Sequence, residues 1–492
     1  PGVALEVIGS VSGSSTSTGS FGSLVVADAI QGRTEIKGNF VPRGALNSGT
    51  NNVVIGDGAY SSGVSGVRNV VIGQNASGGE TMTDVDDSVI IGYRAGYKLI
   101  DGYYNVYIGP QAGYNNTTSN TNVGIGYNAL YTDGSIYGNN VAIGHEALKN
   151  QSGSSSQMEN TAIGASAGGA VTTGARQVFV GFAAGTATTT GAYNTMMGWR
   201  AGYSNTTGAY NTFLGNYAAN SNLTGGQNVA IGNQAAYGGT KANKYVAIGY
   251  DALYYFGASK VDEESVGIGY LAGKYATGSY NTFVGSQAGK GGTTSAPYSS
   301  GINNTAVGYN ALAGFTTGIL NVAIGVNALD AVTTATRNVA VGSGAGGGTT
   351  SSGGVFIGNF AGSAANIDNV VLIGRDAGAS VTGTGNLAIG YTALGVHTTG
   401  VRNIAIGEGA MDDTDAGSTS LGSNDNIFIG YDVGGGTWAD AESKENVAIG
   451  NYAMDGALDG AIRNVAIGHE ALSGATGADY NQAIGYRALY NV

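Results

Sequence analysis

The stretch Asn321-Val-Ala-Ile-Gly-Val-Asn-Ala-Leu329 decides the fold, because it is one copy of a unit that recurs along most of the chain. Counted from the glycine equivalent to Gly325, the unit occurs 25 times. Twelve of the 24 intervals between these anchor glycines are 17 residues long, and the others span 16 to 23 residues. A period this short, sustained over so many copies, predicts a solenoid.

Each position of the unit has a structural interpretation. The positions of Val322 and Ile324 hold β-branched or other aliphatic residues in nearly every copy, as expected for two residues on one side of a short strand. Ala328 recurs in 24 copies, which predicts a crowded place where a returning segment enters the interior. Asn321 recurs in 19 copies. Because Asn tolerates left-handed backbone angles, we expect it both to turn the chain and to form a side-chain ladder.

The residue between Val322 and Ile324 bears on the quaternary structure. It is Ala, Val, Ile, Leu, Met or Phe in 22 copies and is never charged. In a strand with one wet face this residue should be polar. A coil of about 17 residues has too little chain to cover its own outside, so we expect a second chain to cover this residue. The alternative is an exposed alanine row on a monomeric solenoid, against which the Phe copies, such as Phe179 and Phe356, argue.

Length and composition agree with one long repetitive body. The repeat occupies residues 51–492, and residues 1–50 are expected to form a β cap or a joint segment. The 492 residues include 89 Gly, no Cys and 11% charged residues, with a net charge of −12, which argues against binding to a nucleic-acid backbone. No apolar run approaches the roughly 18 residues that a membrane span needs. Stacked at the usual strand spacing, 25 coils would give a rod roughly 120 Å long.

Loop insertions are the expected places for recognition. The long intervals carry extra residues that project from one edge of a solenoid. Tyr298 and Trp438 in these loops, together with Trp199, are the candidate residues for receptor contact. Recurrent Thr-Thr pairs, several of them followed by Gly, are interpreted as the far corner of the coil.

Catalytic signatures are weak in this sequence. No Ser-His-Asp set or carboxylate pair stands out, and a uniform repeat offers no concave pocket, so we expect no enzyme activity and no resident cofactor. Asp413 and Asp415 lie near a glycine in an arrangement that resembles part of a calcium loop. The downstream Glu of such a loop is missing at the required spacing, which leaves calcium a minor hypothesis.

The repeat resembles two known groups of proteins. N-V-A-I-G followed by x-x-A is similar to the repeat of trimeric autotransporter adhesin heads of the YadA type. The longer unit at residues 304–318, N-T-A-V-G-Y-N-A-L-A-G-F-T-T-G, is similar to bacteriophage tail-fibre repeats. The resemblance implies a left-handed parallel β-roll packed as a homotrimer. The coils here are longer than in those adhesin heads, and no coiled-coil stalk, membrane barrel or self-cleaving chaperone domain is visible.

These observations together predict an all-β protein, a parallel β-solenoid of about 25 short coils. The resemblance implies a receptor-binding fibre at a virion or cell surface, such as a phage tail fibre, that attaches to a host glycan or protein. A cellular adhesin of the same architecture, a self-assembling extracellular filament without a receptor, and an ice-binding solenoid with Thr rows remain as alternatives. The expectation that a second chain covers the solenoid depends on the middle residue of each strand.

Overall fold

The computed structural model describes residues 51–60, 66–79, 83–132, 138–153, 158–257, 264–295, 297–348, 352–363, 367–396, 399–413, 422–438, 441–477 and 479–491. Residues 44–492 form one compact unit. The expected N-terminal segment, residues 1–50, lies outside the described residues. The described part contains strands and turns but no helix.

Every strand is three residues long. In chain order they are β1 Val53–Ile55, β2 Val70–Ile72, β3 Asp84–Asp86, β4 Val89–Ile91, β5 Asp101–Tyr103, β6 Val106–Ile108, β7 Val123–Ile125, β8 Val141–Ile143, β9 Thr161–Ile163, β10 Val178–Val180, β11 Thr195–Met197, β12 Thr212–Leu214, β13 Val229–Ile231 and β14 Val246–Ile248. The others are β15 Val266–Ile268, β16 Thr282–Val284, β17 Thr305–Val307, β18 Val322–Ile324, β19 Val339–Val341, β20 Val355–Ile357, β21 Val371–Ile373, β22 Leu387–Ile389, β23 Ile404–Ile406, β24 Ile427–Ile429, β25 Val447–Ile449, β26 Val465–Ile467 and β27 Gln482–Ile484.

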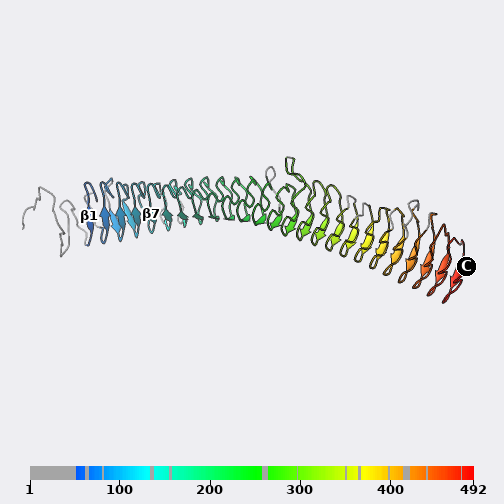
Figure 1. The fold of residues 1–492 in the computed structure, drawn as a ribbon. Coiled ribbons are helices and arrows are strands. Elements are labelled where there is room, and N and C mark those ends of the chain that lie inside the picture. Colours follow the sequence, from blue (N-terminus) through cyan, green and yellow to red (C-terminus); the bar gives the residue numbers. More distant parts are fainter. Residues whose placement is uncertain are drawn as a thin grey trace, which may run out of the picture. The chain divides into compact units, whose positions relative to one another are not determined.

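Twenty-five of these strands form one parallel sheet, in which each strand pairs with the equivalent strand of the next coil (Figure 1). The register places equal repeat positions opposite each other. Val322 of β18 lies opposite Thr305 of β17 on one side and Val339 of β19 on the other. The number of strands matches the number of anchor glycines, so the parallel β-solenoid expected from the repeat is confirmed.

The middle residue of each strand lies inside the coil, and our inference about it was wrong. It is buried in every strand of the main sheet, as Ala323 illustrates. The returning half of the same coil covers it, through side chains such as Ala328, Leu329 and Val332, all fully buried. A coil of 17 residues therefore does enclose a narrow core without a second chain. The residues that face outward are those at the positions of Val322 and Ile324.

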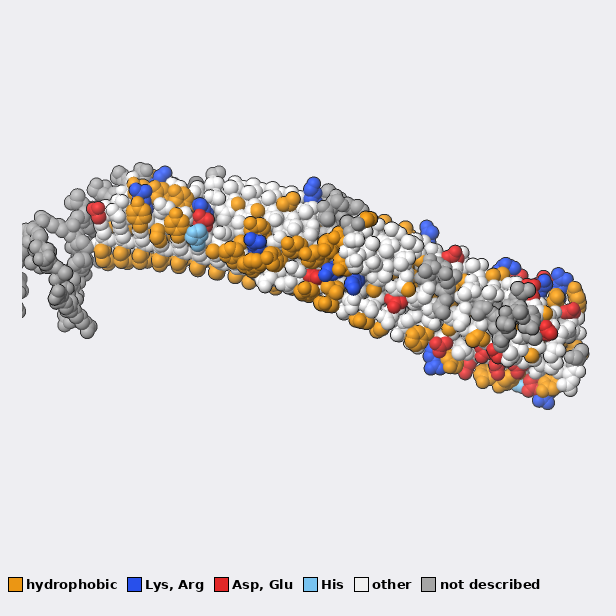
Figure 2. Space-filling view, turned by 45° about the horizontal axis from the view of Figure 1, so that its top comes forward, with side chains coloured by type: hydrophobic (Ala, Val, Ile, Leu, Met, Phe, Trp, Pro, Cys, Tyr) orange, Lys and Arg blue, Asp and Glu red, His pale blue; other side chains and the backbone are white. Residues whose placement is uncertain are grey.

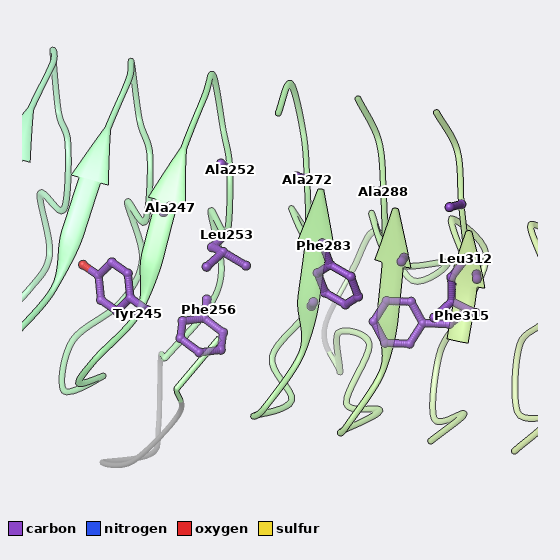
Figure 3. Close-up of a cluster of buried hydrophobic side chains, with 14 of the residues drawn as sticks. Tyr245, Ala247, Ala252, Leu253, Phe256, Ala272, Phe283, Ala288, Leu312 and Phe315 are labelled. Atoms are coloured by element: carbon purple, nitrogen blue, oxygen red, sulfur yellow. The ribbon is translucent and has the colours of Figure 1, made fainter. Parts of the chain in front are cut away.

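Large side chains pack beside small ones in parts of this core, as in the cluster around Phe283 and Leu253 (Figure 3). The rings of Phe283 and Phe315 approach to 5.6 Å between centroids. In the neighbouring strand β15 the middle residue is Gly267, where a β-carbon would collide with the side chain of Leu253. Bulky residues in one coil thus fill the space that small residues leave in the next, which keeps the stack close-packed.

Buried asparagines form the expected ladder, whereas the left-handed backbone lies elsewhere. The backbone N–H of Asn321 donates to Oδ1 of Asn304, and that of Asn338 donates to Oδ1 of Asn321. The left-handed residue is the one before each asparagine, such as Leu320 with φ of 60°. The prediction that Asn itself takes the left-handed angle was wrong, because the preceding residue makes the turn. The Asn side chain instead bonds the backbone of the next coil.

The anchor glycine is required by two physical constraints. Gly325 has φ of 132°, a conformation that residues with a side chain rarely adopt. A β-carbon there would also overlap the main-chain carbonyl of Gly342 in the next coil. Every anchor glycine from Gly56 to Gly468 meets the next one in this way, so glycine sets the close approach of successive coils.

One insertion contains structure that the sequence did not predict. The long interval between Gly73 and Gly92 is one of those expected to carry a projecting loop, but β3 within it pairs in parallel with β5 to form a separate two-stranded sheet. Val85 is fully buried there. The insertion therefore extends the stacking locally and gives the coil a second short strand.

Candidate functional site

The outward side of the main sheet is a mainly aliphatic surface, which we call the strand face. It consists of the first and third residues of its 25 strands, and these are Val, Ile, Leu, Met or Thr except at Gln482. Ile324 keeps 40% of its surface exposed, and Ile55 keeps 42%. Figure 2 shows a regularly spaced row of hydrophobic side chains along one edge of the repeat region. Thr161, Thr195, Thr212, Thr282, Thr305 and Gln482 are the polar members of this otherwise aliphatic strip. Large exposed apolar patches are a common feature of protein interaction surfaces.

Ion pairs between neighbouring coils occupy the corner before the strand face. Arg68 pairs with Asp87 at 2.5 Å, and Arg402 pairs with Asp425 at 2.7 Å. Arg402 lowers the pKa of Asp425 by donating hydrogen bonds to its carboxylate. Arg68 has the same effect on the pKa of Asp87. Ion pairs thus border the strand face in some coils, whereas other coils place an exposed Tyr or Leu at the same corner, as at Tyr210 and Leu320.

Tyrosines on another part of the coil form a stacked column. The rings of Tyr97, Tyr114 and Tyr131 lie in three coils with centroids 5.1 Å apart, at interplanar angles of 15° and 8°. Tyr193 and Tyr210 stack similarly at 5.0 Å. Because each ring covers the face of its neighbour, these residues pack coil against coil. A ring that is stacked on both sides, such as Tyr114, has little face left for a sugar ring.

A second set of rings is arranged differently, and we call it the aromatic track. One or more rings come from each of seven consecutive coils: Phe182, Trp199, Tyr217, Tyr237, Tyr254, Tyr255, Tyr275 and Tyr298. The track contains two residues that the sequence singled out separately, Trp199 and Tyr298. They lie about a hundred residues apart in the sequence, and only the stacking of coils connects them through the intervening rings.

Trp438, the third aromatic candidate, lies in the core. Only 2% of its surface is exposed, and its ring packs against Phe428 at 5.7 Å. Its Nε1 donates a hydrogen bond to the carbonyl of Gly434 at 3.0 Å. In this position Trp438 fills its own coil and offers no surface to a receptor.

Acidic residues gather near the C-terminal coils around a small cavity of about 160 Å³. Its lining includes Glu408, Asp412 and Asp432. Burial raises the pKa of Asp412 to about 6, and the neighbouring carboxylates of Asp432 and Asp413 add to the shift. Burial also raises the pKa of Asp455 to about 6, with Asp432 contributing.

The calcium hypothesis gains no support from this region. Asp413 accepts a hydrogen bond from the hydroxyl of Thr437 at 2.6 Å, and Asp415 lies outside the described residues. Within the described ranges, no group of three or more His, Asp or Glu side chains is arranged to hold a metal ion.

The threonine pairs occupy a corner of the coil, as the sequence suggested. The hydroxyl of Thr172 donates to the carbonyl of Thr189 in the next coil, and that of Thr189 donates to the carbonyl of Thr206. Thr316 bonds to Thr333 in the same way. Hydroxyls that already hold the adjacent coil are engaged in structure, which supports the interpretation as a turn.

The comparisons with known proteins add no relative. The chain matches no protein-family model. It also matches no curated protein. Among the described residues, none belongs to a helix long and apolar enough to span a bilayer. The function must therefore be argued from the strand face and the aromatic track.

Proposed function

We propose that this protein is a structural, receptor-binding fibre of the tail-fibre type. In this proposal three copies associate through their strand faces into a stiff shaft, which presents binding surfaces to a host from a virion or cell surface. Repetition of each weak site on three identical chains would raise the effective affinity without strong single contacts.

The strand face is the observation that carries this proposal. Three residues across and 25 strands long, it measures about 1,200 Å² at the usual spacings of a sheet, which exceeds the roughly 800 Å² per partner of a standard protein interface. Its two aliphatic positions recur once per coil. A second copy of this chain has the same repeat spacing, and so can match the rows of the strand face along their whole length.

Native mass measures the association directly. A monomer has a mass of 49.0 kDa, and the proposal expects three times that value in native mass spectrometry or light scattering. Three lysines on adjacent strands should weaken or dissociate the assembly, because they place unpaired charges in an apolar contact. The variant combines Ile324→Lys, Val341→Lys and Ile357→Lys.

The matched control places three lysines at sites that are equally exposed but lie off the strand face. Leu223, Leu320 and Val326 keep 38%, 44% and 47% of their surfaces exposed. Their combined lysine variant should keep the native mass. A wild-type chain that stays at 49.0 kDa at micromolar concentration would refute the shared shaft.

A further inference from the structure

We propose that the aromatic track binds a linear acidic glycan that lies along the stack of coils. This inference rests on the proposed function, and it assigns the receptor-binding surface of the fibre to a particular set of residues and to one class of ligand. It concerns the side of the coil that carries the track and makes no use of the strand face.

The contacts along the track are of two kinds. Five are stacked pairs, namely Phe182–Trp199, Tyr237–Tyr254, Tyr255–Tyr275, Tyr255–Tyr298 and Tyr275–Tyr298, and three are edge-to-face. Trp199 and Tyr217 meet at 4.5 Å with an interplanar angle of 81°, and Tyr217 meets Tyr237 at 5.9 Å and 69°. Tyr254 and Tyr255 form a third contact of this kind at 4.6 Å and 65°. In an edge-to-face contact one ring contributes only its edge, so its own faces are not covered by that neighbour. The stacked column of Tyr97, Tyr114 and Tyr131 has no such contact.

The track is also exposed and long enough for a polymer. Phe182 and Trp199 keep 49% and 40% of their surfaces exposed, and the tyrosines of the track are half-buried. Seven coils span roughly 29 Å at the usual strand spacing, a length that accommodates several sugar rings in a row. Figure 2 shows hydrophobic side chains gathered into a broad patch midway along the repeat region.

The charges around the track favour an anion. Residues 182–298, which span the track, contain six Lys or Arg and four Asp or Glu, although the whole chain has a net charge of −12. Arg200 lies 5.1 Å from the ring of Trp199 and 4.8 Å from that of Tyr203. None of the ion pairs among the described residues includes Arg200, and its Nε is buried without a hydrogen-bond partner. A guanidinium held against aromatic rings and lacking a counter-ion is well suited to a carboxylate.

A glycan fits this arrangement better than a single-stranded nucleic acid does. Nucleic-acid binding needs a groove with many unpaired cations, because every nucleotide carries a phosphate. Here Lys244 is paired with Glu264, and Lys274 is paired with Asp251. An aromatic surface with few unpaired cations instead suits a glycan. The sugar rings of a glycan present apolar faces, and its acidic groups can be widely spaced.

The test uses the full chain and an array of linear uronic-acid and sialic-acid oligosaccharides, each also present as its uncharged methyl ester. We expect the wild-type chain to retain acidic oligosaccharides. The variant Trp199→Ala with Tyr237→Ala should bind at least about tenfold more weakly, since it removes two rings from the track. The variant Arg200→Gln should lose about tenfold for the acidic forms and little for the methyl esters.

The stacked column supplies the control. Tyr97→Ala with Tyr114→Ala removes two rings that make only stacked contacts and should leave binding unchanged. Three results would overturn the inference: no acidic oligosaccharide retained by the wild-type chain, equal retention by the track and column variants, or tighter binding of oligo-dT than of any glycan. Native mass, measured in parallel, distinguishes this failure from failure of the shaft, because a trimer without glycan binding refutes only the inference.

Discussion

The side-chain oxygen of Asn304 accepts a hydrogen bond from the backbone N–H of Asn321 in the next coil, at a distance of 3.0 Å. The Nδ2 of Asn304 donates to the carbonyl of Gly318 at 2.9 Å. One fully enclosed side chain thus satisfies backbone groups on two segments. Removal of such a side chain leaves buried polar groups without partners, which is more costly than the loss of an average hydrogen bond.

The variant Asn304→Ala should therefore destabilise its own coil and the next by about 1–3 kcal/mol per unsatisfied group. Hydrogen exchange measured by mass spectrometry should show faster exchange for residues 299–325 than for distant coils, since solenoid coils contact mainly their neighbours. Asn233→Ala, at an exposed asparagine, is the control and should leave exchange unchanged. Equal protection in the two variants would contradict a structural role for the ladder.

Two anchor glycines allow backbone strain to be separated from steric overlap. Gly325 and Gly485 have φ of 132° and 126°. A β-carbon on Gly325 would overlap the carbonyl of Gly342, whereas nothing lies within 4 Å of one on Gly485. Both alanine variants should lose about 1–3 kcal/mol from the unfavourable backbone angle. Gly325→Ala should lose more, because the neighbouring coil must also move. Thermal unfolding curves that shift equally would show that the overlap is relieved without cost.

Tyr245 occupies the ladder position that asparagine fills in most coils. It is almost fully buried, and its hydroxyl has no hydrogen-bond partner among the described residues. Burial raises the pKa of this hydroxyl. Tyr245→Phe removes an unsatisfied polar group and should leave stability unchanged or raise it by about 1 kcal/mol.

Tyr107 is the matched control for Tyr245, because it is also fully buried but its hydroxyl bonds to Asn105 and Asn116. Tyr107→Phe should lower stability by about 1 kcal/mol. The free energy of unfolding, measured with denaturant, should therefore fall for Tyr107→Phe and stay unchanged or rise for Tyr245→Phe. A larger loss for Tyr245→Phe than for Tyr107→Phe would mean that the Tyr245 hydroxyl has a partner after all.

The acidic C-terminal coils should become more stable on mild acidification. The pKa values of Asp412 and Asp455 lie near 6 in the folded chain, against an ordinary value of 3.8. Between about pH 4 and 6 the folded state holds protons that the unfolded chain releases, so stability falls as pH rises through this window. Both carboxyls are partly exposed to solvent, which limits the expected gain at pH 5 over pH 7 to about 1 kcal/mol each.

Local hydrogen exchange in residues 404–470, corrected for the intrinsic effect of pH, measures this change. The double variant Asp412→Asn with Asp455→Asn should abolish it, because neither amide titrates. The acidic loop residue Asp368 provides the control, and Asp368→Asn should keep the wild-type pH dependence. Exchange that slows as pH rises from 5 to 7 would contradict the assignment.

The repeat in the sequence was sufficient for the architecture. An aliphatic pair around one residue, an anchor glycine, an alanine three residues later and an asparagine four residues earlier predicted short parallel strands, a solenoid and a polar ladder. Each of these features acts locally or between equivalent positions of adjacent coils, so periodicity alone reveals it. The buried positions of Ala328 and Asn321 confirm this part of the prediction.

The tertiary structure decided which side of each strand faces inward and which aromatic residues meet. Alternation along Val322-Ala323-Ile324 gives two apolar sides, and the sequence does not state which one the returning segment covers. The small Ala323 fits the narrow interior beside Ala328, which leaves Ile324 outside. Likewise, Trp199 and Tyr298 belong to one aromatic track, whereas Trp438 lies in the core. Which side chains come close depends on how the coils stack and not on their separation in the chain.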